Sequence, residues 1–173
     1  EIRNLRLWAR KHISPLRRLS MTAGSEHLTA SLARLILYRR PELLDTAERP
    51  VRDLLAWHAL EEVEHKAVCF DLYQQAGGGY QMRITGLAFS IMDLLKHLHQ
   101  GTKYLLQEDG LWTWRNRIKL TRELYGRKGL FTSLLPDLLQ YLKPGFHPWD
   151  TDERADLHER FGDLLDPLEE AAA

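Results

Sequence analysis

The fold is decided by residues 50–79, which read PVRDLLAWHALEEVEHKAVCFDLYQQAGGG. Pro50 suits the first turn of a helix, because proline lacks the backbone N–H that a first turn leaves unpaired. The three glycines from Gly77 to Gly79 can adopt the positive φ angles with which helices end. We therefore predict one long helix that begins at Pro50 and ends at these glycines.

Three polar side chains in the middle of this helix share one narrow face. Because an α-helix turns by about 100° per residue, Glu62 lies about 40° to one side of His58 and His65 about 20° to the other. Glu61 flanks this face, whereas Glu64 points away from it. The same face also holds apolar residues, namely Val51, Leu54, Leu55, Cys69 and Leu72. The pattern predicts two imidazoles and a carboxylate buried within an apolar stripe.

Burying such groups is costly unless they pair with other groups or bind a cation. Glu62 and His65 have the spacing of the helical Glu-x-x-His motif of di-iron and di-manganese carboxylate bundles. In those bundles two helices each carry the motif and two others each supply a single Glu. Glu and His three residues apart also occur by chance, so the hypothesis needs a second element.

Glu26 supplies that element. Its helical neighbours one and two turns away are all apolar or small, namely Leu19, Thr22, Ala23, Ala30, Ala33 and Leu37. A carboxylate framed by alanines has room beside it for a metal ion. It is also the isolated inward Glu that the bundle site requires from a partner helix.

The predicted metal ligands are Glu26, His58, Glu62 and His65. Glu61 and His27 are expected beside the ligands, where Glu61 could orient an imidazole. Such donors suit iron first, with manganese and zinc as alternatives. Iron would activate O₂, whereas zinc or manganese would activate a bound water. The structural alternative is that these side chains pair with Arg, Lys or backbone groups, and the cations named for it are Arg17, Arg34 and Lys66.

The rest of the sequence predicts an all-α protein. Helical periodicity indicates further helices over 2–12, 14–38, 80–107, 111–125 and 130–142, with a short helical turn over 41–47. Residues 143–150 leave the pattern because they contain two prolines and a glycine. We expect a ferritin-like helical bundle over 1–150. The tail over 151–173 begins like a helix at Thr151 and then frays.

The helix over 80–107 contains the apolar stretch GLAFSIMDLL. Asp93, Lys96, His97 and His99 interrupt it, so it is shorter than the roughly 20 apolar residues of a membrane span. We expect a buried bundle helix that could line a substrate pocket, with contact to a bilayer surface or a partner helix as the alternative. The basic residues over 115–122 are expected to be solvated, or else to meet an acidic substrate.

Composition excludes several classes of protein. The chain has 24 Lys and Arg and 24 Asp and Glu among 173 residues, and this balance argues against a dedicated nucleic-acid binder. Cys69 is the single cysteine, which excludes an internal disulfide and fits a reducing compartment. No secretory signal is visible in the charged first residues, so we expect a cytoplasmic protein. The sequence starts without Met within an amphipathic pattern, from which we expect a further N-terminal portion.

Four stretches resemble a known bacterial family. They read SPLRRLSMTAGSEHLTA over 14–30, WHALEEVEHKAVCFDLYQQAGGGY over 57–80, GRKGL over 126–130 and YLKPGFHPWD over 141–150. The family is described as predicted metal-dependent hydrolases. By this resemblance, Glu26, His58, Glu62 and His65 match positions expected to hold metal. Members of the family carry an earlier helical region with its own Glu and Glu/His motif, which these residues lack.

The resemblance thus implies half of a two-metal ligand set. A preceding segment or a second copy in a symmetric homodimer could complete it. On ligand types alone we expect O₂-dependent oxidation of a small apolar substrate ahead of its hydrolysis by a metal-activated water. The alternatives from other classes are a non-catalytic helical scaffold or regulatory module, and a membrane-peripheral protein that uses the helix over 80–107.

Overall fold

The computed structural model describes residues 7, 10–153, 156 and 159. Within that part of the chain every regular element is helical, which confirms the all-α class, whereas a ferritin-like bundle stays a prediction. The α-helices are α2 (Pro15–Arg34), α3 (Glu42–Asp45), α4 (Arg49–His65), α5 (Val68–Gln75), α6 (Tyr80–Glu108), α7 (Trp114–Tyr125) and α8 (Leu130–Tyr141). A π-helical turn, Leu35–Arg39, extends α2, and a 3-10 turn covers Pro148–Asp150.

The predicted ends of these helices are largely confirmed. Ser14 caps α2 by accepting a hydrogen bond from the backbone N–H of Arg17, and Pro15 follows at the first helical position. The predicted helix over 2–12 lies mostly outside the described residues. The helix predicted to begin at Thr151 does not begin there, since residues 151–153 are irregular. Most of the predicted tail after residue 153 lies outside the described residues.

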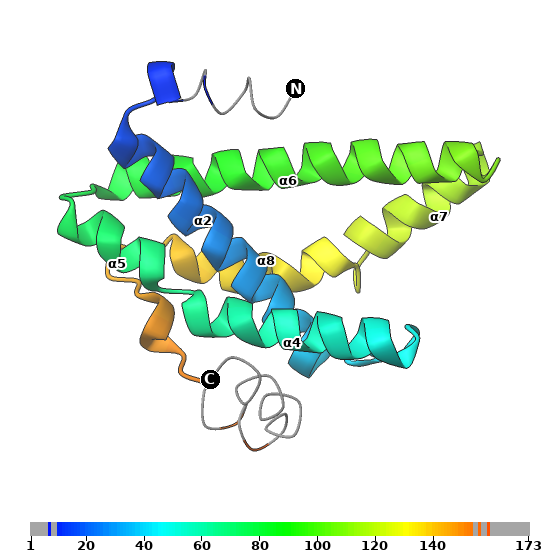
Figure 1. Ribbon diagram of the computed structural model, residues 1–173. Coiled ribbons are helices and arrows are strands. Elements are labelled where there is room, and N and C mark those ends of the chain that lie inside the picture. The colour runs from blue at the N-terminus through cyan, green and yellow to red at the C-terminus, as the bar shows by residue number, and fades with distance from the viewer. Residues whose placement is uncertain (1–6, 8–9, 154–155, 157–158, 160–173) are drawn as a thin grey trace.

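Helix α2 organises the molecule, since it packs against α4, α5, α6 and α8. Figure 1 shows α2 running diagonally between α6 on one side and α4 on the other. The crossing of α2 and α6 depends on two glycines. A Cβ on Gly86 would lie 2.4 Å from the carbonyl oxygen of Ser20, and one on Gly24 would lie 2.7 Å from the Cα of Leu87. The two backbones therefore meet at a distance that excludes side chains at these positions.

The single helix predicted over residues 50–76 is two helices, and this prediction is wrong. Lys66 and Ala67 form a turn between α4 and α5. Lys66 is buried, its Nζ lies 2.7 Å from Oε2 of Glu153, and it also donates to the carbonyl of Thr151. The same ammonium lies 4.5 Å from the centre of the Trp149 ring. The break therefore coincides with a lysine that turns into the interior, where burial lowers its pKa.

Two apolar clusters form the core. One joins α2 and α4 and contains Ala33, Leu37, Leu44, Ala56, Ala59, Leu60 and Val63. The other joins α2, α5, α6 and α8 with the loop after α8 and contains Ala23, Phe70, Leu87, Tyr141 and Phe146. Helix α4 thus buries the side that carries its alanines, opposite the stripe predicted to be inside. Small side chains let α4 approach α2 closely, which explains why that side is preferred.

Helix α6 is buried over its first half only. Its buried residues are Arg83, Gly86, Leu87 and Ser90. Figure 1 shows that its second half continues beyond α2 and is followed by α7, which returns toward α8. The expectation of a helix buried along its length is therefore wrong for its second half. Among the described residues no helix is both long and apolar enough to cross a membrane.

Candidate metal centre

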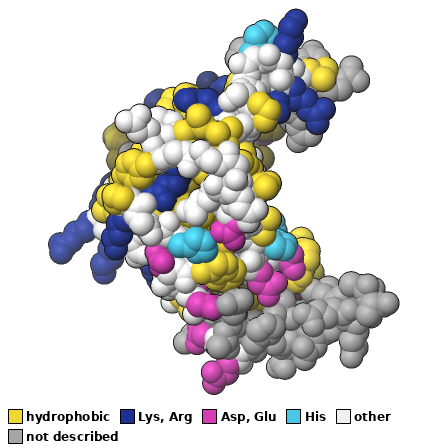
Figure 2. Space-filling model, turned by 90° about the vertical axis from the view of Figure 1, so that its left-hand side faces the viewer, with side chains coloured by type: hydrophobic (Ala, Val, Ile, Leu, Met, Phe, Trp, Pro, Cys, Tyr) yellow, Lys and Arg dark blue, Asp and Glu magenta, His cyan; other side chains and the backbone are white. Residues whose placement is uncertain are grey.

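The chain segregates its charges although its formal net charge is zero. Figure 2 shows acidic and histidine side chains gathered in the lower half of the face that it presents. Most Lys and Arg side chains of that view lie in the upper half and along the left edge. A cation approaching this side would be attracted to the acidic half.

Glu62 lies where α4 meets α2. Its Oε1 is 3.5 Å from Nε2 of His58, one helical turn earlier, and its side chain is 26% exposed. Its Oε2 accepts a hydrogen bond of 2.5 Å from the hydroxyl of Thr29 on α2. The sequence reasoning missed Thr29, although its position one turn after Glu26 was a signal that it shares that face.

The two candidate imidazoles project into solvent. The side chains of His58 and His65 are 64% and 63% exposed, so the burial predicted for them is wrong. The apolar members of the stripe are exposed as well, because α4 packs with its opposite side. Nδ1 of His65 lies 3.8 Å from Oε2 of Glu61, so the carboxylate partner of His65 is Glu61 and not Glu62. This pairing is the one that an orienting role for Glu61 would need, and that role stays a prediction.

Glu26 is half-buried and points toward the start of α5. Its Oε2 accepts a hydrogen bond of 3.0 Å from the backbone N–H of Cys69. A carboxylate is favourable at this place, since the first turn of a helix has unpaired N–H groups and a partial positive charge. Burial raises the pKa of the Cys69 thiol to about 12, and the Glu26 carboxylate beside the thiol acts in the same direction. Glu26 therefore has a structural partner in the described chain.

The cations named by the structural alternative have other partners. Arg34 lies 3.3 Å from Asp137 and 2.9 Å from Glu153, and Lys66 also pairs with Glu153. Arg17 lies over an aromatic ring of α6. Arg34 and Lys66 thus pair with carboxylates elsewhere in the chain, whereas the backbone partner that the alternative also predicts is found for Glu26.

His27 belongs to the interior. Its Nε2 is 3.1 Å from the backbone carbonyl oxygen of Asp137, and its ring packs between those of Tyr141 and Phe146 at 4.6 and 5.2 Å. Burial lowers its pKa to about 4, so the ring is neutral at neutral pH. Its hydrogen bond goes to α8, and its predicted place beside the metal ligands stays a prediction.

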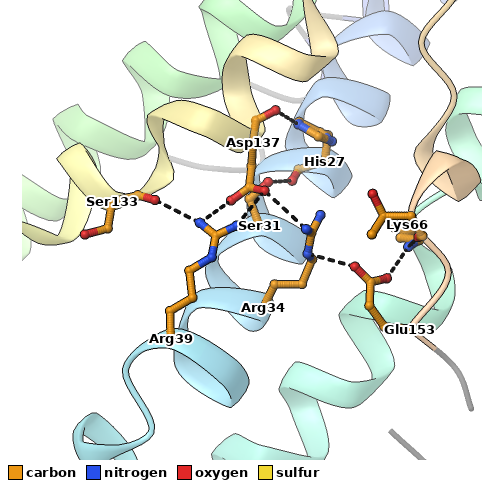
Figure 3. A network of polar contacts seen from close by, with 9 residues as sticks. His27, Ser31, Arg34, Arg39, Lys66, Ser133, Asp137 and Glu153 are labelled. Carbon is orange, nitrogen blue, oxygen red and sulfur yellow. Dashed lines mark hydrogen bonds and ion pairs between the residues drawn. The ribbon is translucent and has the colours of Figure 1, made fainter. Parts of the chain in front are cut away.

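Asp137 is the centre of a buried polar network, drawn in Figure 3. Its carboxylate lies 2.8 Å from Nη1 of Arg39 and 3.3 Å from Nη2 of Arg34. Arg39 also donates to the carbonyl of Ser133, and Arg34 pairs with Glu153. The figure shows these side chains converging from α2, the turn after it, α8 and the segment after the 3-10 turn. The network ties the two ends of the described chain together.

A second histidine–carboxylate pair fixes the loop after α8. Nε2 of His147 lies 2.8 Å from Oδ1 of Asp71 on α5. Nδ1 of the same ring accepts the N–H of Trp149, so the proton is on Nε2 and is donated to Asp71. His147 is therefore held by contacts from both of its ring nitrogens.

The donors on α4 suit a metal in type but are incomplete in number. Carboxylate oxygen and imidazole nitrogen are ligands of iron, manganese and zinc. His58 and Glu62 are close enough to share one ion after a small side-chain movement. Within the described residues no group of three or more His, Cys, Asp or Glu is arranged to hold a metal. The face thus offers part of a ligand set.

Comparison with known proteins gives one match. Residues 1–152 match the family described as Predicted metal-dependent hydrolase, which confirms the resemblance seen in the sequence. A search of curated proteins and a search of solved structures gave no match. The match gives no support to the expected O₂-dependent oxidation over hydrolysis.

Proposed function

Since this chain belongs to the family of predicted metal-dependent hydrolases, we propose that it is a hydrolase whose metal is held on the open face of α4. The observation that supports the site is the pair formed by Nε2 of His58 and Oε1 of Glu62, 3.5 Å apart on an exposed surface. Iron, manganese and zinc all suit these donors. His65 and Glu26 are the further ligands that we propose from this chain.

The residues of the site have different tasks. A bound divalent ion supplies Lewis acidity and lowers the pKa of a water molecule. Nε2 of His58 and Oε1 of Glu62 would bind the ion. The hydroxyl of Thr29 donates to Oε2 of Glu62 and so holds that carboxylate in place. Glu61 sets the orientation of His65. Exposed apolar residues surround these groups, so we propose a small substrate with an apolar portion; the nearest are Leu54, Leu55 and Val68.

Completion of the ligand set requires another helix on this face. The polar residues of the stripe read alike from both ends, because His58 and Glu61 are mirrored by His65 and Glu62. A second copy packed antiparallel would set His58 of one chain beside His65 of the other. It would also bring carboxylates together, which a bound cation would stabilise. We therefore propose a symmetric dimer ahead of a preceding segment of the same chain.

Metal content tests the site. After reconstitution with iron, manganese or zinc, the Glu62→Ala variant should bind metal at least about tenfold more weakly than the parent chain. The matched control is Glu64→Ala on the same helix, where the side chain is exposed and points away from the stripe. Equal metal content in the parent and in Glu62→Ala would contradict the site. Absence of metal in all three would favour the non-catalytic scaffold.

Sedimentation velocity with and without metal tests the partner. We expect a dimer that forms with metal and is lost in Glu62→Ala. A monomer with a full complement of metal would contradict the dimer and leave the preceding segment as the source of ligands. Hydrolysis of small apolar esters, measured with the same variants, tests the reaction. Oxygen consumption in place of ester hydrolysis would contradict the proposed reaction class.

A further inference from the structure

Helix α7 lies at the edge of the molecule, away from the candidate metal centre. Figure 1 shows it beyond the crossing of α2 and α6, in the part of the fold farthest from α5. Its principal packing partner is α8, and none of its residues is buried. One side of α7 therefore packs against α8, and the opposite side is exposed to solvent.

The open side of α7 carries an apolar stripe. Trp114, Ile118 and Tyr125 recur at four- and seven-residue steps and fall within about 40° of one another on the helix. Of the three, Tyr125 also stacks on Phe131 of α8, with ring centres 5.3 Å apart. Trp114 is 66% exposed and Ile118 is 51% exposed. Leu111, just before the helix, extends the stripe and is also exposed. Exposed aromatic and aliphatic side chains in such a row mark a surface that binds something.

Basic side chains border the stripe. Arg115, Lys119 and Arg122 lie on one flank and Arg117 on the other, and all four are exposed. Residues 114–128 contain six Lys or Arg and a single Glu, although the whole chain is neutral. The single carboxylate is that of Glu123, which lies on the side of α7 opposite the apolar stripe. It pairs with Lys119 at 3.9 Å. The flanks therefore present positive charge to whatever meets the stripe.

An open groove runs along the more basic flank. It has a volume of about 550 Å³, and its lining contains five basic side chains and one acidic side chain, Glu123. Those nearest the apolar stripe are Arg115, Lys119 and Arg122. The groove ends at Gly126 and Lys128, where α7 gives way to the turn before α8. Its lining suits anionic groups such as phosphates lying beside an inserted apolar row.

We propose that α7 docks the protein on an anionic membrane surface. The helix would lie in the plane of the interface, with Trp114 and Ile118 inserted among the acyl chains and the flanking Arg and Lys side chains at the phosphates. This arrangement is typical of interfacial amphipathic helices, whose apolar face is bordered by Lys and Arg and contains Trp. Each basic residue near an anionic bilayer adds attraction, so charge and apolar area act together.

A bilayer fits this face better than a protein partner does. Protein interfaces are depleted in charged residues at their centres and in Lys throughout, whereas Arg, Trp and Tyr are enriched in them, so the comparison depends on the positive charge of the flanks. Here four cations, from Arg115 to Arg122, lie along about two helical turns on both sides of the apolar row. The positive charge matches phosphate groups, and the narrow apolar row matches the shallow depth that an interfacial helix reaches. The inference is independent of the proposed metal centre, which lies on α2 and α4.

Vesicle sedimentation tests the inference with the whole chain. The parent should bind vesicles of phosphatidylcholine with about 30% phosphatidylglycerol and bind pure phosphatidylcholine at least about tenfold more weakly. The variant with Arg115→Glu and Arg122→Glu should lose about tenfold or more of the binding to anionic vesicles. The variant with Trp114→Ser and Ile118→Ser should lose a similar factor. Both pairs are exposed, so thermal melts should match the parent.

Matched controls change the same residue types elsewhere. The pair Arg49→Glu and Lys143→Glu, and the single change Leu139→Ser, are exposed positions outside α7 and should leave vesicle binding unchanged. Equal loss in these controls would overturn the assignment to α7, as would equal binding by parent and α7 variants. Self-association that the α7 variants abolish, without vesicle binding, would overturn it in favour of contact between copies.

Discussion

Two arrangements of a histidine and an acidic residue, one joining α2 to α8 and one on α4, lie in opposite surroundings. His27 and Asp137 lie in the interior, where a hydrogen bond joins the ring to the backbone of Asp137 and two arginines face its carboxylate. His58 and Glu62 lie on the surface, with one hydroxyl from α2 as their link to the rest of the protein. Both arrangements combine a histidine with an acidic residue, but only the interior one has charged partners on other elements of the fold.

The difference separates groups that hold the fold from groups that are free to bind. In the interior set, the partners come from different helices, so each contact joins segments that are far apart in the sequence. In the surface set, each imidazole faces a carboxylate of its own helix one turn away. Such pairs contribute little to stability in water. Their donors can therefore turn toward a ligand without unfolding the chain.

Removal of the Asp137 carboxylate should have the largest effect on stability. We expect Asp137→Ala to lower the free energy of unfolding by about 3 to 4 kcal/mol, because it leaves Arg34 and Arg39 without their shared buried partner. Urea denaturation followed by circular dichroism measures the change.

Glu62→Ala is the matched comparison from the open face. It should lower the free energy of unfolding by less than about 1 kcal/mol, since its partners are exposed or are simple hydroxyls. If Asp137→Ala and Glu62→Ala lowered the free energy of unfolding equally, the distinction between the buried Asp137 network and the exposed face of α4 would be wrong.

The interior histidine should make stability depend on pH. Burial lowers the pKa of His27 to about 4 from 6.5, so acid protonates the unfolded chain first and favours unfolding. Stability from this group is complete above pH 6.5 and is lost as the pH falls toward 4. Between about pH 7.5 and about pH 5 the loss should be about 2 kcal/mol.

The variant His27→Phe isolates this contribution. Phenylalanine keeps an aromatic ring between Tyr141 and Phe146 but cannot titrate, so its unfolding free energy should vary less over the same pH range. The surface counterpart is His58→Asn, which should keep the pH profile of the parent. If His27→Phe retained the full pH dependence, the titrating group would lie elsewhere.

Local signals predicted the helices well but not which side of α4 is buried. Proline, serine and glycine placed the ends of α2 and of the α4–α5 region, because caps depend on neighbours in sequence. The angular arithmetic also placed His58 and Glu62 together. The same arithmetic could not decide whether the apolar stripe or the alanine side of α4 is buried, since either side can pack against another helix. Close approach to α2 decided for the alanine side.

Long-range polar contacts were outside the reach of sequence patterns. Asp137 follows a proline within α8 and meets arginines about 100 residues earlier, so nothing near it in sequence signals its burial. Lys66 likewise breaks a helix because of Glu153, 87 residues away. The candidate metal-ligand motif was visible because His58 and Glu62 lie one turn apart on one helix, whereas no sequence pattern indicates which further residues would complete the proposed site.

Glu26 lies between the two regions, and its removal tests to which of them it belongs. If it is chiefly a ligand with a capping contact, Glu26→Ala should lower the free energy of unfolding by only about 1 kcal/mol, the usual cost of a lost helix cap. The Cys69 thiol should then react faster with iodoacetamide, because its raised pKa depends partly on Glu26. Thr22→Ala, one turn earlier on α2 and exposed, is the control for both measurements. A loss of several kcal/mol would instead place Glu26 with Asp137 among the groups that hold the fold, and the open face would then have to bind metal without it.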